Sequence, residues 1–532
     1  MYHRDGRTAT VSVRRSDQGL VVLATNGKPD ASLSGTWFLT DTTRRALRND
    51  DETQLLLPLV ALAHRPRAQS MAVIGHGSGI TSHLLLGAPS ARQVTTIEIE
   101  PEIVKASMVF YPFNRRAFED PKARLVLEDA RAYFAGAAEP FDLIVSEPSN
   151  PWVSGVSGLF TKEFYAQVRR NLAADGVFAQ WLHLYEMNDD LVRSVLAALQ
   201  TSFPVYDVYM VGESDIAVIA TVGDDLSSPD WSVVDFPLVR EDLARVAPLT
   251  PTILGGLHVA SSEVLGPFVG TAKPNSDFEP LLDVRAERAR FIATSAVGFR
   301  TLNSISFDFA SALSRRPLAL PLTVQPAVDV SRINIRATSA RLRAGFHRDS
   351  VVRDTTLYAA IQRRNGHDAM VRSGRPTPNW QLWTQRLAMI DRDIHGGSAG
   401  ALDTVLYNPL EPYLRQTNAP PVVRSAVEFM RAMNAWDFVA ASRAADVLVA
   451  HQMRGENWIP ADYLRDGAVT AKLMTGDPRG ALRVFSGVNR FTRTDAVGRF
   501  RSGLLLSHIA RGFSGNQAGS RLAPTPPYRQ PR

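Results

Sequence analysis

The 532-residue sequence predicts an α/β protein with a doubly wound sheet, a small N-terminal β region and a C-terminal α-helical domain. Three observations lead to this prediction. Residues 7–40 alternate between apolar and polar side chains with a period of two, which is typical of strands. Short apolar runs alternate with helix-length segments over residues 71–222, as in a parallel sheet with crossover helices. Residues 420–511 repeat small and apolar side chains at helical spacing.

The N-terminal β region is expected over residues 1–66. Asn26-Gly27 lies between two alternating runs, and this dipeptide favours the tight turn of an antiparallel hairpin. The polar segment "HRPRAQS" ends this region as a hinge. We therefore expect a small antiparallel sheet ahead of the main domain.

The main sheet is expected within residues 67–290. Five short apolar runs predict its strands: "MAVIG", "VTTIEIE", "ARLVLE", "DLIVS" and "GVFAQWL". Two later runs, "YDVYMV" and "DIAVIAT", are separated by a short turn and predict an antiparallel pair at the edge of the sheet. Residues 223–290 predict a smaller α-rich extension.

The remainder of the chain divides into three predicted segments. Residues 291–419 predict a linker with irregular and helical parts, and residues 420–513 predict a tetratricopeptide-like helical domain. Residues 514–532 lack the apolar content to fold and predict a disordered tail.

Composition excludes several classes of function. The chain has no cysteine, which removes disulfides, thiolate nucleophiles and cysteine zinc sites, and its eleven histidines form no H-x-x-x-H pair, so no metal is expected. The net charge of +6 comes without a Lys/Arg block, so no nucleic-acid partner is expected. The longest apolar run, "LLLPLVALA", is shorter than the ~20 residues of a membrane helix. We expect a soluble, cytoplasmic protein.

A glycine-rich turn follows the first strand of the main sheet. "MAVIGHGSGITSHLL" places Gly75, Gly77, Ser78 and Gly79 between that strand and a helix, where the backbone can approach a ligand closely. The spacing is G-x-G-x-G, whereas the dinucleotide fingerprint is G-x-G-x-x-G, so a nicotinamide cofactor is disfavoured. Taken alone, the turn is interpreted equally well as a tight connection.

Two acids at the next strand ends favour a nucleoside ligand. Glu98 ends the second strand about twenty residues after the glycine turn, where an acid can accept both ribose hydroxyls. Asp129 follows the third strand, where an adenine amino group would lie. The alternative for Glu98 is a solvated strand end. The three elements together predict a Rossmann-like domain of the class I methyltransferase type with an S-adenosylmethionine-type pocket.

The fourth strand ends in "FDLIVSEPSNPW". Glu147 and Asn150 follow this strand on a loop that Pro148 and Pro151 stiffen, so both are expected to face the ligand. A carboxylate there can accept a proton from an attacking amine. The alternative is a helix N-cap with Glu147 merely solvated.

Four aromatic side chains near the predicted pocket leave two interpretations open. His76 lies in the glycine turn and His183 follows the fifth strand, and a structural role is favoured for both. Trp181 and Tyr185 could wall an acceptor pocket, although core packing explains Trp181 equally well.

Residues 1 to about 290 resemble the spermidine synthase (polyamine aminopropyltransferase) family. The segments "EIEPEIV", "EDARAYF", "SEPSNPWVSGVSGLFTKEFY" and "PNSDFEPLLDVRAERAR" carry the resemblance. They are most similar to the bacterial branch in which this domain follows a multi-pass membrane region. The resemblance implies an amine acceptor, S-adenosylmethionine or its decarboxylated form as co-substrate, no metal, and a homodimer as one option.

The resemblance also implies roles for particular residues. Gly75, Gly77 and Gly79 would wrap the aminopropyl or methionine end of the donor, and Glu98 would hold its ribose. Glu147 falls where the family has the aspartate that deprotonates the attacking amine. The remaining implied contacts are Asp129 and Ala130 to adenine, and Gln54, Ser146, Asn150 and Trp152 to the substrate.

Three departures from the family pattern concern the amines. Ser78 replaces the aspartate that grips the primary amine of the donor, and Asn150 replaces a second aspartate for the acceptor. Thr53-Gln54-Leu55 stands where the family has Y-x-E. Each lost charge-assisted contact is worth ~1.5–3 kcal/mol. The sequence therefore predicts an intact nucleoside pocket and weakened recognition of a polyamine.

Three functions remain open from the sequence. The first is an aminopropyltransferase that uses decarboxylated S-adenosylmethionine. The second is a methyltransferase that uses the intact donor, which Ser78 favours because an acid there would repel the donor carboxylate. The third is a non-catalytic nucleoside-binding module whose helical domain recruits a protein partner.

Overall fold

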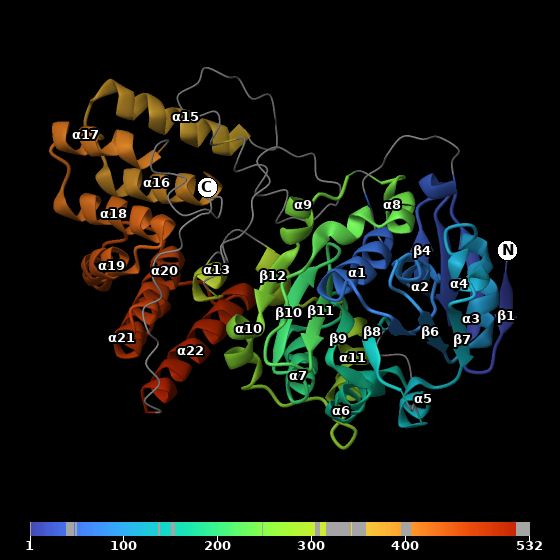
Figure 1. Ribbon diagram of the computed structural model, residues 1–532. Helices are drawn as coiled ribbons and strands as arrows, with labels where there is room; N and C mark the ends of the chain where they lie inside the picture. The colour runs from blue at the N-terminus through green and yellow to red at the C-terminus, as the bar shows by residue number, and fades with distance from the viewer. Residues whose placement is uncertain are drawn as a thin grey trace.

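The computed structural model describes residues 2–38, 47, 50–136, 139–149, 155–246, 248–303, 309–314, 342, 358–394 and 406–517. Figure 1 shows an elongated arrangement, with the β-rich part toward the N-terminus and the α-helical part at the opposite end. The main sheet stands between the small N-terminal sheet and the C-terminal helices.

The N-terminal sheet has four antiparallel strands in the order β1-β2-β3-β4. Asn26 and Gly27 take φ angles of 50° and 81° between β3 and β4, the left-handed conformation that a tight hairpin turn requires. The predicted hairpin is therefore confirmed. The strands are β1 (His3–Asp5), β2 (Thr10–Arg15), β3 (Val21–Thr25) and β4 (Lys28–Leu33).

The main sheet has eight strands in the order β12-β10-β11-β9-β8-β5-β6-β7. Strands β5 to β9 are parallel, as predicted, because helical crossovers connect them. The chain turns from β5 toward β6 and β7 on one side and then crosses to β8 and β9 on the other. This switch point opens a crevice at the carboxyl ends of β5 and β8. The parallel strands are β5 (Ser70–Ile74), β6 (Gln93–Glu98), β7 (Ala123–Leu127), β8 (Phe141–Ser146) and β9 (Leu172–His183).

The last three strands correct one prediction. β10 (Val205–Met210) and β11 (Asp215–Thr221) form the expected antiparallel pair. They do not form the edge, because β12 (His258–Ser261) pairs with β10 on its outer side. β12 spans four residues inside a segment of helical pattern, and a run this short shows no period of its own.

Helix α1 (Asp50–His64) connects the two sheets and contains the apolar run that was too short for a membrane helix. Three acidic residues occupy its first turn, where they interact favourably with the helix dipole. Nearly every residue of α1 is buried, and it packs on α2, β8, β9 and β11. The first turn of α1 is thereby held at the crevice.

The other helices of this part of the chain cover the main sheet and its far edge (Figure 1). They are α2 (Ile80–Leu85), α3 (Pro101–Ala106), α4 (Arg116–Glu119), α5 (Ala130–Gly136), α6 (Lys162–Arg170), α7 (Asp189–Gln200), α8 (Pro237–Leu243), α9 (Pro251–Gly255), α10 (Ser262–Val269), α11 (Leu281–Phe291), α12 (Val297–Arg300) and α13 (Phe309–Ser314).

The C-terminal helices pack consecutively against one another from α18 to α22. Helix α22 also packs on α10 and α12, where Phe500 lies edge-on between Phe268 and Phe299 with ring centroids 5.2 and 5.0 Å away. These helices are α15 (Tyr358–Ser373), α16 (Trp380–Ile394), α17 (Asn408–Gln416), α18 (Pro421–Ala435), α19 (Phe438–Met453), α20 (Ala461–Met474), α21 (Pro478–Val488) and α22 (Ala496–Gln517).

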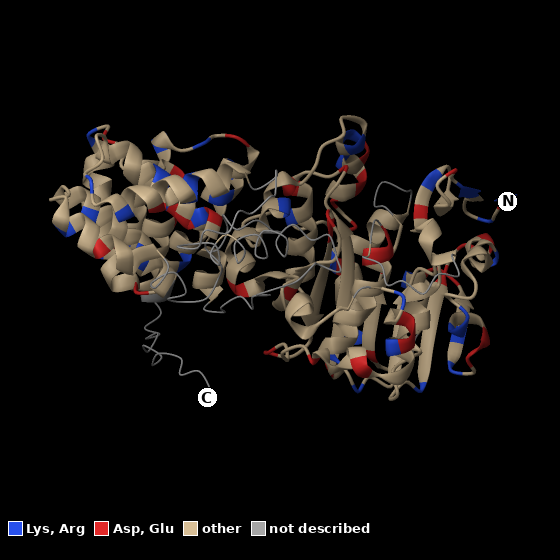
Figure 2. Cartoon of the chain, turned by 90° about the horizontal axis from the view of Figure 1, so that it is seen from above, with Lys and Arg blue, Asp and Glu red and all other residues tan. Residues whose placement is uncertain are grey.

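The tetratricopeptide-like character of these helices and the domain boundaries stay predictions. Residues 304–308, 315–341, 343–357 and 395–405 of the predicted linker and residues 518–532 of the predicted tail lie outside the described residues. Within the described part of the chain, no helix is long and apolar enough to cross a membrane. Figure 2 shows basic and acidic residues interspersed along both the β-rich and the helical part.

Candidate active site

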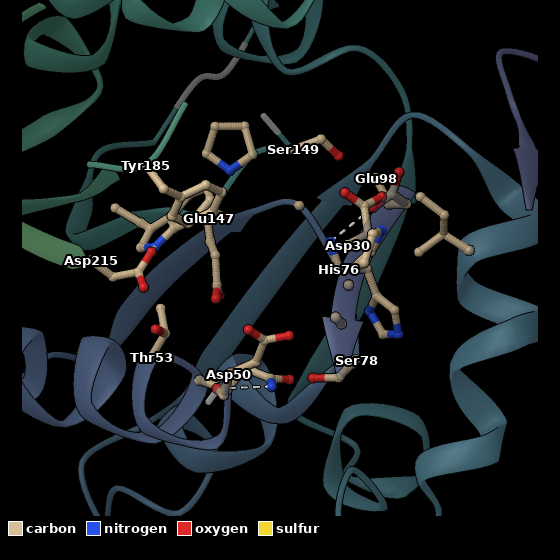
Figure 3. A pocket seen from close by; sticks show the side chains of 18 residues that line it. Asp30, Asp50, Thr53, His76, Ser78, Glu98, Glu147, Ser149, Tyr185 and Asp215 are labelled. Atoms are coloured by element: carbon tan, nitrogen blue, oxygen red, sulfur yellow. Dashed lines mark hydrogen bonds between the residues drawn. The ribbon is translucent and has the colours of Figure 1, made fainter. Parts of the chain in front are cut away.

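A pocket opens at the carboxyl ends of β5, β6 and β8, between the N-terminal sheet and the first turn of α1 (Figure 3). Its walls come from segments far apart in the sequence. The lining residues are Pro29, Asp30, Ala31, Asp50, Thr53, Gln54, Gly75, His76, Gly77, Ser78, Glu98, Ile103, Glu147, Pro148, Ser149, Trp181, Tyr185 and Asp215.

The glycine turn forms the floor of this pocket at the end of β5. Gly75 has a φ of 90°, and a Cβ atom there would lie 2.5 Å from the Glu147 carbonyl oxygen. Only glycine therefore lets the ends of β5 and β8 approach so closely. Gly75, Gly77 and Ser78 line the pocket, whereas Gly79 packs beneath the His76 ring at the start of α2 and is not a lining residue.

Glu98 is built into the pocket rather than solvated at a strand end. It is 5% exposed, and its two carboxylate oxygens accept hydrogen bonds from the backbone N–H groups of His76 (2.8 Å) and Glu100 (2.9 Å). Burial raises the pKa of Glu98 to about 7, although these two hydrogen bonds act to lower it. Glu98 thus fixes the end of β6 to the glycine turn and presents its carboxyl group to the pocket.

Three of the predicted contacts lie away from the pocket lining. Asp129 accepts a hydrogen bond from the Ala132 backbone N–H at 3.0 Å, and Ala130 is buried in α5. Both residues follow β7, the exposed edge strand of the sheet. Ser146 is fully buried within β8.

Glu147 lies in the pocket directly after β8. Its Oε2 accepts a 2.6 Å hydrogen bond from the Thr81 hydroxyl, and its backbone N–H donates to the Ile74 carbonyl at 2.9 Å. Burial raises the pKa of Glu147 to about 7, and the charge of Asp50 raises it further. The structure therefore does not support the alternative of a merely solvated Glu147. Asn150, Pro151 and Trp152 lie outside the described residues.

Three further acids line the pocket that were not expected there. Asp30 lies on β4, Asp50 opens α1, and Asp215 opens β11. Asp50 accepts a 2.5 Å hydrogen bond from the Ser32 hydroxyl, and Asp215 accepts a 3.1 Å bond from the Trp181 indole N–H.

Burial raises the pKa of all three acids, that of Asp215 to about 7 with further increases from the charges of Asp50 and Glu147. These acids lie at other positions than Ser78 and Asn150, where the sequence lacks the acids of the family pattern. No pattern in the sequence marks these residues, because folding alone brings them together.

His76 and His183 are both buried, and His76 also lines the pocket. His76 Nε2 lies 2.9 Å from the Ser107 hydroxyl, and burial lowers the pKa of His76 to about 4. Burial likewise lowers the pKa of His183 to about 3, so both rings are neutral at physiological pH. Trp181 and Tyr185 both line the pocket. Within the described ranges, no cluster of three or more His, Cys, Asp or Glu side chains could hold a metal ion.

Comparison with known proteins places this pocket in context. Residues 52–212 match the model of the spermine/spermidine synthase domain. A polyamine aminopropyltransferase of Nitrosomonas europaea is 30% identical over 243 residues, which are 44% of this chain and 73% of that protein. A polyamine aminopropyltransferase of Caldicellulosiruptor saccharolyticus is 28% identical over 155 residues, 29% of this chain and 55% of that protein.

Among solved structures, spermidine synthase from Thermotoga maritima aligns with a TM-score of 0.35 and 19% identity, covering 46% of this chain and 87% of that one. The fold and pocket define a Rossmann-like domain with an acidic pocket at its strand ends. The chain belongs to the spermine/spermidine synthase family, a family of transferases.

Proposed function

We propose that this protein transfers an aminopropyl group from decarboxylated S-adenosylmethionine to an amine acceptor, with Glu147 as the general base. The observation that carries the proposal is the position of Glu147, whose carboxyl group lies in the pocket beside the glycine turn. The family and its curated aminopropyltransferases support the same reaction.

The proposed reaction is a single displacement at carbon. The acceptor nitrogen attacks the methylene carbon bound to the sulfonium sulfur, and the carbon–sulfur bond breaks with its electron pair going to sulfur. The sulfonium becomes the neutral thioether of methylthioadenosine, and the new ammonium gives its proton to Glu147. A base with a pKa of about 7 is well matched to accept that proton near neutral pH.

The donor is proposed to bind along the strand ends. Gly75 and Gly77 allow the backbone to approach its sulfonium end, and Glu98 accepts the ribose hydroxyls. Asp129 and Ala130, which follow β7, are proposed to contact the adenine. The glycine turn and the buried carboxyl group fit such a nucleoside.

The acidic lining favours the decarboxylated donor over S-adenosylmethionine itself. Five carboxyl groups line the pocket, those of Asp30, Asp50, Glu98, Glu147 and Asp215, with no Lys or Arg among the described lining residues. The carboxylate of intact S-adenosylmethionine would be repelled by these like charges, whereas the primary ammonium of the decarboxylated form is attracted. The acidic lining therefore outweighs the preference for methyl transfer that Ser78 suggests.

A Glu147→Gln variant tests the proposal. Removal of a general base typically lowers turnover by about 10²–10⁴-fold, and calorimetric affinity for methylthioadenosine should stay within about twofold because the nucleoside contacts are untouched. Glu213→Gln is the matched control, since the Glu213 side chain is 80% exposed and pairs with Arg300 at 3.2 Å. Full turnover in Glu147→Gln would refute the role of Glu147 as base.

A further inference from the structure

Helix α22 joins the C-terminal helices to the α/β part of the chain. It packs on α20 and α21 on one side and on α10 and α12 on the other. Figure 1 shows α22 lying beside α10, on the side of the main sheet away from the N-terminal sheet. The family match ends at residue 212, and the reaction proposed above gives the C-terminal helices no role. What α22 contacts therefore indicates what these helices contribute.

Phe500 is the centre of the contact that α22 makes with the α/β part. Its side chain is 3% exposed, and its ring lies edge-on to Phe268 of α10 and Phe299 of α12, with centroids 5.2 and 5.0 Å away. Gly298 of α12 faces the same ring, and a Cβ atom at this position would overlap it. A glycine is therefore needed for α12 to lie this close to α22.

Helix α12 is tied in turn to the residues that follow β9. Two backbone N–H groups of α12 donate to the two carboxylate oxygens of Asp189 in α7, each at 3.1 Å. Directly before α12, the Ala296 N–H and the Ser295 hydroxyl donate to the Leu184 carbonyl at 2.8 and 3.0 Å. The segment from Ser295 to the end of α12 is thus fastened both to α7 and to the residues after β9.

These contacts reach Tyr185, which forms a wall of the pocket. Tyr185 lies two residues beyond the end of β9 and makes an antiparallel bridge with Ser295. The next residue, Glu186, has a φ of 51°, a left-handed conformation that is unfavourable for a residue other than glycine. Surrounding contacts must therefore hold the backbone here, and the bridge to Ser295 provides one of them.

We propose that Phe500 is a positioning residue for the pocket, through which the C-terminal helices hold the wall formed by Tyr185. The line of contacts runs from α22 through α12 to Ser295, whose hydroxyl bonds to Leu184 and whose backbone pairs with Tyr185. Packed side chains and hydrogen bonds of this kind can couple distant sites. Figure 3 shows Tyr185 and Glu98 toward opposite sides of the pocket, so loosening α22 should release one side and leave the other unchanged.

Hydrogen–deuterium exchange followed by mass spectrometry tests this inference on the ligand-free full chain. In Phe500→Ala, the amides of residues 183–186 and 294–300 should exchange about tenfold faster than in the wild type, because the contacts that oppose local opening are lost. The amides of the glycine turn, residues 73–80, should exchange at the wild-type rate. Phe500→Leu keeps most of the apolar volume and should return exchange to within about threefold of the wild type.

Two further variants make the test specific. Gly298→Ala disturbs the same contact from the α/β side, since the added Cβ overlaps the Phe500 ring. It should speed exchange in the same two segments, and it serves as the second probe if Phe500→Ala does not fold. Phe429→Ala removes the same kind of side chain from α18, where Phe429 is fully buried beside Tyr463. It should leave residues 183–186 at the wild-type rate.

The kinetic readout of this inference rests on the proposed aminopropyl transfer. With the amine against Tyr185, Phe500→Ala should raise the KM for 1,4-diaminobutane about tenfold and leave kcat within about twofold, because the wall contributes equally to the binding of substrate and transition state. Calorimetric affinity for methylthioadenosine should stay within about twofold, since its proposed contacts lie at the glycine turn and Glu98. Phe429→Ala should change neither the KM nor this affinity.

The outcomes separate this inference from the proposed function. Faster exchange at residues 183–186 in Phe500→Ala, with no aminopropyl transfer by the wild type, would support the coupling and overturn the reaction. Wild-type exchange there in both Phe500→Ala and Gly298→Ala would overturn the coupling, whether or not the protein turns over. Equally fast exchange in Phe429→Ala would overturn the role of Phe500, because general loosening of the C-terminal helices would then explain the effect.

Discussion

Replacing Glu147 by glutamine is expected to stabilise the ligand-free protein above neutral pH while it slows the reaction. The Glu147 carboxyl group has a pKa of about 7 in the folded protein, against an ordinary value of 4.5. The folded state therefore binds a proton more tightly than the unfolded state. The contribution of Glu147 to stability is fully present below pH 4.5 and is lost as the pH rises through 7.

The size of this effect follows from the two pKa values. A tenfold change in proton affinity is worth ~1.4 kcal/mol, so the full difference is about 3 kcal/mol. Glu147 is half-buried, and pocket water screens part of its charge, so we expect about 1–2 kcal/mol. Glutamine keeps the shape of the side chain and cannot ionise, so the variant avoids this loss.

Urea unfolding at pH 5 and pH 8 measures the effect. Between these two pH values the wild type should lose about 1–2 kcal/mol of unfolding free energy more than Glu147→Gln does. Glu213→Gln, whose carboxyl group is exposed, should follow the wild type. An identical pH dependence in Glu147→Gln and the wild type would refute the conclusion that burial raises the pKa of Glu147.

Three other predictions concern the pocket and the helical domain. Gly75→Ala should lower methylthioadenosine affinity at least tenfold in calorimetry, since a Cβ there would lie 2.5 Å from the Glu147 carbonyl oxygen; affinity equal to wild type would contradict the close approach of the two strands. The kcat/KM for the amine should rise with pH through about 7, because Glu147 must be ionised to accept a proton; a profile flat from pH 6 to 8 would contradict this. Asp391→Ala should lower the unfolding free energy by about 2–4 kcal/mol in urea titrations, because buried Asp391 accepts a 2.5 Å hydrogen bond from the Tyr463 hydroxyl. An unchanged urea midpoint would show that this hydrogen bond contributes little to stability.

The sequence predicts the sheet well because the parallel strands are short apolar runs with turn residues between them. Their order along the chain also places the glycine turn, Glu98 and Glu147 at strand ends that share one edge. Strand β12 was not predicted because four residues carry too little periodicity.

The acids of the pocket show where prediction from sequence ends. Asp30, Asp50 and Asp215 lie on three elements whose approach depends on the packing of the N-terminal sheet and α1 against the main sheet. Each of them alone resembles an ordinary surface acid in the sequence. The roles of Asn150 and Trp152, a homodimer, and a protein partner of the helical domain stay predictions.

The measurement that tests the central claim most directly is product analysis by mass spectrometry. The purified protein is incubated with 1,4-diaminobutane and either decarboxylated S-adenosylmethionine or S-adenosylmethionine. We predict equimolar methylthioadenosine and aminopropylated diamine from the decarboxylated donor, and neither product from the intact one. A methylated product from the intact donor, or no product from the decarboxylated one while methylthioadenosine still binds, would contradict aminopropyl transfer in this pocket.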